Sequence, residues 1–437
     1  MSLASRWVVF AVARGRAVAS STAMSNPPII VVGAGIVGVS TAIWLRRFGK
    51  EVLLLDRAAP GEGASFGNAG LIAQWAVTPV TTPGLWKDIP KFLGKPSSPL
   101  FIEWGYLPRM LPWLMRYLSY ATDRKTLQIV DDLHPLLHDA VDQHKALAQG
   151  TSLDRWVRDS KLSYVYKDEA AFRQDAYSWA LKARCGFEPT LVTGGAVQEE
   201  EPILGSHAQC LAVLEGQGHI TDPGGYVKAL AQLFEDEGGR FVQATVQDIV
   251  KADGRVSHVE TDQGRFDCSE VVVTAGIWSK DLMTKLGLKV QLEAERGYHV
   301  LFEDPSILPR NPMMMTRGKF AVNPMALGLR CAGTVELGSH KTGPRQAPID
   351  FIKKSAAEAF PTLRYSGTKN WMGFRPSTPD SLPMIGQIGA TGIYTGFGHQ
   401  HIGLTAGPKT GRILAQMLSA QTPNAPLGAY DPMRFLR

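Results

Sequence analysis

The chain has few cysteines and no long apolar run, and each absence excludes a class of protein. Its four cysteines lie far apart among 437 residues, and no Cys-X-X-Cys pair occurs. This spacing argues against a zinc site, an iron–sulfur cluster and a disulfide framework, and it favours a reducing compartment. No apolar run reaches the roughly eighteen residues that a membrane-spanning helix needs. We therefore expect a cytoplasmic protein that binds no metal.

Acidic residues are absent from the first fifty positions, since Glu51 is the first of them. Residues 1–23 hold three arginines, and without them the formal net charge falls from +6 to +3, which is too small for a nucleic-acid footprint. The segment fits two interpretations. It is either a transit peptide, which would place the protein in mitochondria, or a start assigned too early, with Met24 as the true first residue. We favour the second and expect residues 1–23 to be disordered.

The most informative motif, GAGIVG, follows an apolar run at residues 29–32, and a second apolar run ends in Asp56. This order predicts a strand, a tight turn, a helix and a second strand. Gly33 permits the turn, Gly35 lets the backbone approach a pyrophosphate, and Gly38 lets the helix pack against the sheet. The helix N-terminus would face the diphosphate, and Asp56 would accept hydrogen bonds from a ribose. The motif therefore predicts an adenine dinucleotide site.

The length of the chain exceeds one typical core, so we expect two domains. Elements typical of a nucleotide fold recur at residues 27–74, 219–289 and 367–437, and we assign these segments to one discontinuous domain. The intervening segments, 75–218 and 290–366, are assigned to a substrate domain.

Several elements are predicted within these segments. Residues 240–249 are predicted to form one strand. Turn signals at 253–254 and 263–264 predict a hairpin after it. Residues 271–273 are predicted to form a buried strand, and residues 410–419 a closing helix.

The discontinuous domain favours FAD over NAD, because NAD domains are usually contiguous. Small residues at 274–276 follow a predicted strand, where a strand end passes near the dinucleotide. A second glycine-rich loop, residues 396–405, precedes the closing helix. The N-terminus of that helix would face the negative charge that builds on a reduced flavin ring.

These motifs resemble the D-amino-acid oxidase superfamily of FAD flavoproteins, and most closely its bacterial D-amino-acid dehydrogenase branch, over residues 27–430. The resemblance rests on GAGIVG, SFGNAGLI, VVVTAGIWS, ERGYH, GFRPSTPDSLPMIG and GFGHQHIGLT, in that order. It implies an α/β fold with a discontinuous Rossmann-like FAD-binding domain. It also implies an α+β substrate domain built on a large mixed sheet.

The resemblance implies FAD contacts that are spread over several segments. They are Gly33, Gly35, Ile36, Val37, Gly38, Asp56, Arg57, Ser65, Asn68, Ala69, Gly70, Leu71, Val246, Ala275, Gly276, Trp278, Gly398, Gly403, Leu404 and Thr405. We expect the flavin to be held without a covalent bond. His401 and Cys331 are the residues through which a covalent bond would form instead.

Oxidation of an amine with FAD requires orientation more than acid–base catalysis, because hydride leaves the α-carbon for flavin N5 once the amine is neutral. An arginine suits this task, because its planar fork binds the substrate carboxylate through two parallel hydrogen bonds. The resemblance places Arg375 at that position. Tyr298 and Arg296 are further candidates to bond the carboxylate, and Tyr298 also to close the pocket. His399 is a candidate to polarise the ring or contact the amine.

Residues 101–120 mix tryptophan and tyrosine with leucines and basic residues, and two interpretations stay open. They are a candidate for peripheral contact with the inner membrane, where a quinone would collect electrons. Alternatively, they form a helical layer that buries its aromatic rings. The sequence does not decide between a quinone, another acceptor and oxygen.

The sequence thus predicts an FAD-dependent D-amino-acid dehydrogenase. It would oxidise a D-amino acid, or a D-imino acid such as a D-proline derivative, to a 2-oxo acid, with release of ammonia from the amino acid. A glycine- or sarcosine-type amine oxidase that uses oxygen is one alternative. A non-catalytic flavin-binding assembly protein is another, and Arg375 argues against it because a scaffold needs no carboxylate anchor.

Overall fold

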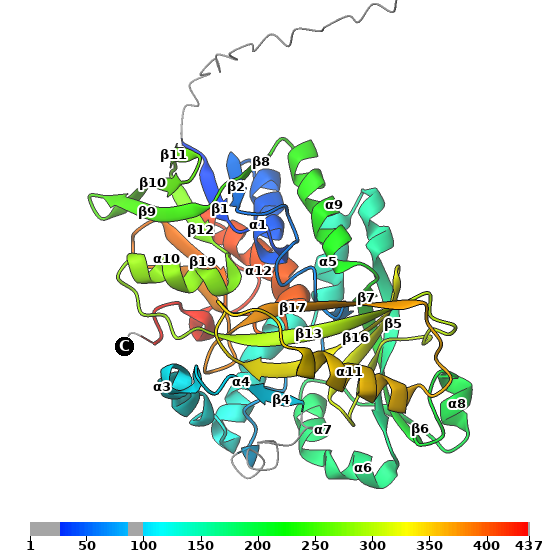
Figure 1. The fold of residues 1–437 in the computed structure, drawn as a ribbon. Coiled ribbons are helices and arrows are strands. Elements are labelled where there is room, and N and C mark those ends of the chain that lie inside the picture. The colour runs from blue at the N-terminus through cyan, green and yellow to red at the C-terminus, as the bar shows by residue number, and fades with distance from the viewer. Residues whose placement is uncertain (1–26, 86–98, 436–437) are drawn as a thin grey trace, which may run out of the picture.

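The strands of the molecule form two large sheets and a small one (Figure 1). The structure is a computed structural model that describes residues 27–85 and 99–435. The predicted leader, residues 1–23, lies outside the described residues. The predicted fold class is confirmed, because a parallel α/β unit adjoins a large mixed sheet.

The first large sheet has six strands and carries the predicted dinucleotide motif. Its order is β18 (Met384–Gln387), β19 (Ile393–Phe397), β12 (Glu270–Val273), β1 (Ile29–Val32), β2 (Val52–Asp56) and β8 (Arg240–Gln243). All neighbours are parallel except β18 and β19. Strand β1 is buried along its whole length, as parallel strands covered on both faces are. The predicted strand–turn–helix–strand order is confirmed, with α1 (Ile36–Arg47) between β1 and β2.

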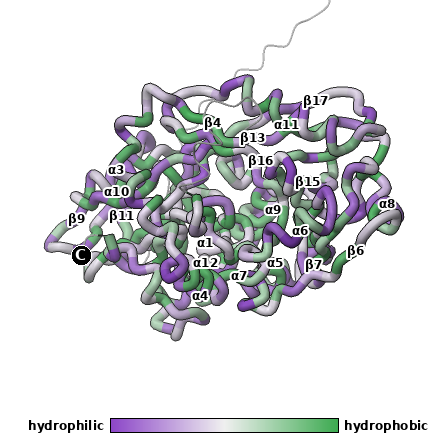
Figure 2. Tube along the Cα trace, turned by 90° about the horizontal axis from the view of Figure 1, so that it is seen from below, coloured by the Kyte–Doolittle hydropathy of each residue, from purple (hydrophilic) through white to green (hydrophobic). Residues whose placement is uncertain are grey.

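Helix α1 lies against two further helices, α12 (Gly403–Leu418) and α9 (Pro223–Asp236), and α12 also contacts α5 (Ala140–Ala148). Figure 2 shows hydrophobic residues gathered around α12 and α4 (Asp123–Leu137), in agreement with the burial of most of α12. The closing helix begins at Gly403, earlier than predicted. Several glycines and Pro408 in its first turns hide the helical pattern in the sequence.

The small sheet consists of β9 (Val246–Ala252), β10 (Arg255–Thr261) and β11 (Gly264–Asp267), and it confirms the predicted hairpin turns. The prediction of one strand over residues 240–249 is wrong, because the chain changes sheet there. The Ala244 N–H donates to the Asp56 carbonyl oxygen (2.8 Å), next to the six-stranded sheet. The following N–H, of Thr245, donates to Asp262 (2.7 Å), which adjoins the small sheet.

The second large sheet has ten strands and is mixed. Its main path is β17 (Gly367–Ser377), β13 (Glu293–Glu303), β16 (Gly328–Leu337), β15 (Phe320–Met325), β14 (Met313–Met315), β5 (Val157–Tyr166), β7 (Cys210–Ile220) and β3 (Leu71–Ile72). Strand β4 (Leu100–Ile102) pairs with β16, and β6 (Thr190–Thr193) pairs with β7. Helix α11 (Gln346–Ala359) packs on β13 and β16.

The remaining helices lie in the connections between strands. They are α3 (Leu107–Leu118), α6 (Glu169–Gln174), α7 (Ala176–Ala183), α8 (Ala196–Glu200) and α10 (Ser279–Lys285). Within residues 27–85 and 99–435, every helix is too short or too polar to span a membrane.

The predicted domain boundaries stay a prediction. Two strands from segments that we assigned to the dinucleotide domain, β3 and β17, hydrogen-bond within the ten-stranded sheet. The chain therefore passes between the two large sheets at residues 56–71 and again at residues 377–384.

We predict that Gly38→Ala destabilises the fold. A Cβ at this position would lie 1.8 Å from the Gly33 carbonyl oxygen and 2.6 Å from Thr274 Oγ1, so α1 would have to move away from the turn. The expected loss is about 1–3 kcal/mol, as for other overpacked sites. Urea unfolding followed by circular dichroism measures it.

Gly63→Ala is the matched control, because a Cβ there meets nothing within 4 Å. Equal unfolding midpoints for Gly38→Ala and the control would contradict the predicted close packing of α1. A loss confined to Gly38→Ala would support it.

Candidate active site

One cavity of about 1580 Å³ is lined by residues of both large sheets. The glycine turn and Asp56 line one part of it, and strands β13 and β17 line another. Its volume exceeds the roughly 300–1,000 Å³ of a pocket for one small ligand. The cavity therefore has room for a dinucleotide with a smaller molecule beside it.

Most of the predicted cofactor contacts line this cavity. They are Gly33, Gly35, Ile36, Val37, Asp56, Arg57, Ser65, Asn68, Ala69, Leu71, Val246, Ala275, Gly276, Trp278, Gly403, Leu404 and Thr405. Three predicted glycines are not among the lining residues. Gly38 packs against the turn, and Gly70 and Gly398 shape the backbone with φ angles of 82° and 87°. That all these residues serve FAD stays a prediction.

The ends of β1 and β2 are tied together by the Asp56 carboxylate. It accepts hydrogen bonds from the backbone N–H groups of Ala34 (2.7 Å) and Ala58 (3.0 Å). The N–H of Ile36 donates to Ser65 Oγ (3.1 Å), which brings the following loop to the start of α1. Since this helix start lines the cavity, its dipole favours an anion there.

Loop residues 66–69 are fixed by a row of hydrogen bonds that the sequence did not reveal. Arg330 donates to the carbonyl oxygens of residues 66 (3.2 Å) and 68 (2.7 Å). His299 Nδ1 donates to that of residue 67 (3.0 Å), and Asn323 to that of residue 69 (2.9 Å). A trans peptide directs its N–H opposite to its carbonyl. The N–H groups of residues 67–70 are therefore directed away from the ten-stranded sheet. Those of Asn68 and Gly70 bond within the loop, to the Ser65 carbonyl oxygen (3.4 Å) and to Asn68 Oδ1 (2.8 Å).

Two histidines precede α12 and line the cavity. Burial lowers the pKa of His399 to about 3, and its Nε2 contacts Thr410 Oγ1 (3.0 Å). Burial and the charge of Arg375 lower the pKa of His401 to about 4. Both rings are therefore neutral near pH 7. His399 thus lines the cavity, and its contact with the flavin ring or the amine stays a prediction.

Arg375 also lines the cavity, on strand β17. Its guanidinium lies over Gly297, where an added Cβ would be 2.5 Å from Arg375 Cζ. Its Nη1 donates to the Thr334 carbonyl oxygen (3.0 Å). Strand β16 bulges at Thr334, which has a φ of 59°, and such bulges often re-aim groups beside active sites. Burial lowers the pKa of Arg375, although a guanidinium stays charged in proteins.

The Tyr298 hydroxyl lies elsewhere than we expected. It donates to Glu336 and accepts a hydrogen bond from the Arg345 N–H (3.2 Å). Side chains alternate between the faces of a strand, so Tyr298 projects to the face opposite that of Gly297. There it packs in the apolar cluster that includes α11. The structure therefore does not bring its hydroxyl together with Arg375, although other parts of Tyr298 line the cavity.

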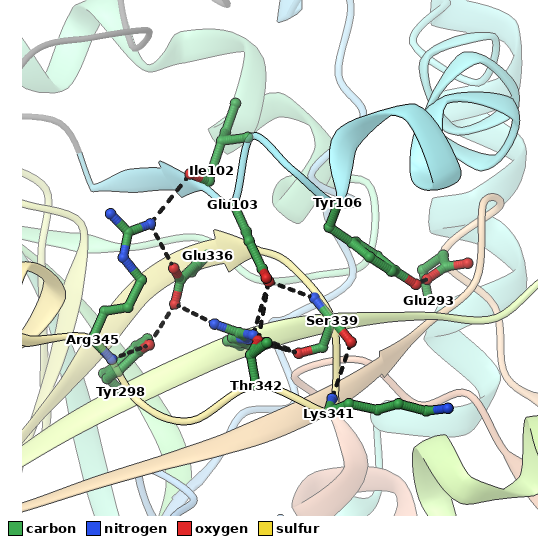
Figure 3. A network of polar contacts seen from close by, with 11 residues as sticks. Ile102, Glu103, Tyr106, Glu293, Tyr298, Glu336, Ser339, Lys341, Thr342 and Arg345 are labelled. Atoms are coloured by element: carbon green, nitrogen blue, oxygen red, sulfur yellow. Dashed lines mark hydrogen bonds and ion pairs between the residues drawn. The ribbon is translucent and has the colours of Figure 1, made fainter.

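Arg296 is a buried structural residue rather than a candidate ligand. Only 1% of it is exposed, and it forms ion pairs with Glu103 (2.9 Å) and Glu336 (3.2 Å). It also donates to the carbonyl oxygen of Ser339 (2.6 and 3.0 Å). These bonds hold the segment after β4 against β16. Arg345 completes the network through Glu336 (3.0 Å), as Figure 3 shows.

Some side chains of residues 101–120, a segment that includes helix α3, are buried, and others lie on the surface. Trp113 and Tyr117 are buried, stack on each other, and line the cavity. Trp104, Leu111 and Met115 are exposed at 61%, 49% and 54%. The buried rings agree with the interpretation as a helical layer, and membrane contact stays a prediction.

Comparisons with known proteins agree over nearly the whole chain. A family model described as FAD dependent oxidoreductase matches residues 28–417. A D-amino-acid oxidase of Bradyrhizobium diazoefficiens is 36% identical, covering 93% of this chain and 99% of that relative. A D-amino acid dehydrogenase of Rhizorhabdus wittichii is 27% identical, over 90% and 97%. The structure of glycine oxidase from Geobacillus kaustophilus has a TM-score of 0.73 at 19% identity, covers 93% and 98%, and shows the fold alone.

We predict that stability falls as the pH is lowered below about 6.5, because His399 is neutral in the folded protein. Its pKa is about 3 when folded and 6.5 ordinarily, so between these values only the unfolded chain takes up the proton. His399→Gln removes this proton uptake and should reduce the slope, while His401, which is also neutral when folded, keeps its own contribution. At pH 5 the difference amounts to about 2 kcal/mol.

Urea unfolding between pH 7 and pH 5 measures the slope. His138→Gln, a change at an exposed position on the C-terminal side of α4, should leave the slope as it is. An unchanged slope in His399→Gln would contradict the neutral buried ring.

Proposed function

The chain belongs to the family of FAD-dependent oxidoreductases, and from this premise we propose that it is a D-amino-acid dehydrogenase. Two electrons and two protons leave the substrate, and water hydrolyses the resulting 2-imino acid to a 2-oxo acid and ammonia. Relatives named D-amino-acid oxidase and D-amino acid dehydrogenase support this substrate class. The observation that carries the proposal is Arg375, a guanidinium held inside a large cavity.

When FAD is bound, it accepts hydride from the α-carbon of the substrate. The residues that would hold it fit its parts: the start of α1 suits the diphosphate and Asp56 a ribose. The N–H groups of Gly67 and Ala69 and the start of α12 suit the ring. We propose non-covalent binding. Cys331 is buried in the apolar cluster beneath α11 and does not line the cavity, so His401, which does line it, is the residue through which a covalent bond would form instead.

The protein orients the substrate through Arg375. Its fork binds the carboxylate, and the bond to the Thr334 carbonyl limits how the fork rotates. His399 and His401 are neutral, so they add no positive charge that would repel the amino group. Trp113 and Tyr117 shield the cavity from bulk water, which strengthens the ionic contacts inside it.

We propose a quinone or another non-oxygen acceptor, reached at a membrane surface through the exposed apolar residues of α3. The relative at 36% identity is named an oxidase, which keeps oxygen as the second candidate. Peroxide formed at the rate of substrate loss would select oxygen.

Two other substrate classes are alternatives. One is a D-imino acid such as a D-proline derivative, and the other is glycine or sarcosine, if the enzyme uses oxygen. A flavoprotein that no amine reduces would be an assembly protein instead.

We predict that Arg375→Leu weakens substrate binding on the order of 100-fold, because one partner of a desolvated charge pair is lost. The flavin should stay bound, since Arg375 contributes nothing to the diphosphate end. Anaerobic titration with D-amino acids, followed by flavin absorbance, measures both. Arg317→Leu, at a side chain 75% exposed, is the matched control. Equal dissociation constants in wild type and Arg375→Leu would remove Arg375 from the site.

We predict that Gly35→Val folds but is colourless. A Cβ at residue 35 meets only Ser65 Oγ, at 3.4 Å, so the protein itself tolerates it. The side chain would instead occupy the space for the pyrophosphate. Circular dichroism checks the fold and visible absorbance the flavin content. A yellow, folded variant would contradict the assignment of the turn to the dinucleotide.

A further inference from the structure

A carboxylate shares the cavity with Arg375 and has no part in the function proposed above. Glu295 of β13 lies directly opposite Arg375 of β17 in the antiparallel ladder. Residues in this relation project to the same face of the sheet. Glu295 is only 6% exposed, and both residues line the cavity.

Arg375 does not form an ion pair with Glu295. Its guanidinium lies further along the sheet, over Gly297, and donates to the Thr334 carbonyl oxygen (3.0 Å). Among residues 27–85 and 99–435, no Lys, Arg or His forms an ion pair with Glu295. A buried carboxylate without a counter-ion is costly, so this position favours a cation supplied from the cavity.

The titratable and charged groups that face Glu295 are consistent with a cation supplied from the cavity. Burial raises its pKa, and the charge of Arg375 together with Ser377 opposes that shift. Tyr117 of α3 also faces it, and burial and the charge of Glu295 raise the pKa of Tyr117. His401, beside Arg375, is neutral near pH 7 because burial lowers its pKa. Arg375 is therefore the one charged group that acts strongly on Glu295.

The spacing of the two charges defines the ligand. The Arg375 guanidinium lies over Gly297, two residues along β13 from Glu295, and two residues of a strand span roughly 7 Å. A ligand that satisfies both must carry a negative and a positive group close together, as an α-amino acid does on one carbon. A cation at the end of a long side chain fits this spacing less well.

We propose that Glu295 receives the α-ammonium group of the substrate while Arg375 binds its carboxylate, so that the pair recognises the zwitterion. The inference rests on the proposed function, because it concerns the same site. It explains how the site would reject acids that lack the amino group. Such acids bind Arg375 but leave Glu295 buried without a partner.

The test uses two probes that differ only in the ammonium group. 2-Aminoisobutyrate is a zwitterion without an α-hydrogen, so it cannot be oxidised, and 2-methylpropanoate is the same acid without the amine. Their dissociation constants for the holoenzyme are measured by perturbation of the flavin absorbance. We expect the preference for 2-aminoisobutyrate over 2-methylpropanoate to fall at least tenfold in Glu295→Gln. Glu295→Asp, which keeps the charge, should retain part of the preference.

Glu293→Gln is the matched control. Glu293 lies on the same strand, but it pairs with Lys280 (2.6 Å) and bonds Tyr106 (2.9 Å), and it does not line the cavity. We expect this variant to keep the wild-type preference. An unchanged preference in Glu295→Gln, or an equal fall in Glu293→Gln, would overturn the proposal.

The outcome also separates this inference from the proposed function. If wild type binds both acids and Glu295→Gln keeps the preference, only the role of Glu295 fails. If neither acid perturbs the flavin of the wild type, the carboxylate site fails, and the role of Glu295 fails with it.

Discussion

The candidate site depends on one row of hydrogen bonds between the two large sheets, at loop residues 66–69. Each of their four carbonyl oxygens accepts a hydrogen bond from His299, Arg330 or Asn323 of the ten-stranded sheet. These bonds join a loop that lines the cavity beside the glycine turn to the sheet that carries Arg375. Hydride transfer tolerates little misplacement of the reacting atoms. The precise position of this loop therefore matters more than the stability that its hydrogen bonds add.

The two faces of strand β13 have different roles. Glu295 and Gly297 face the cavity, where Gly297 leaves room for the Arg375 guanidinium. Arg296 and Tyr298 face the other way, and both bond the Glu336 carboxylate. Consecutive residues of one strand therefore line the cavity beside Arg375 and supply the ion pairs that hold the segment before α3 in place.

The parts of the fold and site that could be predicted from the sequence are those that short local motifs encode. The glycine turn and Asp56 are contiguous with their strands, so the motif sufficed to place them. Arg375 came from the resemblance, and the structure places it in the cavity. The sequence could not reveal Arg330, because an isolated polar residue in a strand does not show which distant loop it contacts. Nor could it show that the Tyr298 hydroxyl is bonded by Glu336, a residue of the neighbouring strand.

In the proposed site, a bound flavin and a carboxylate anchored by Arg375 meet in one cavity that accepts D-amino acids. Anaerobic titration of the purified holoenzyme with D-alanine and with L-alanine tests this arrangement, by following the visible absorbance of the flavin. We expect D-alanine to bleach the flavin while L-alanine leaves it unchanged. Bleaching by L-alanine alone, or a purified protein that neither contains nor takes up FAD, would contradict the account.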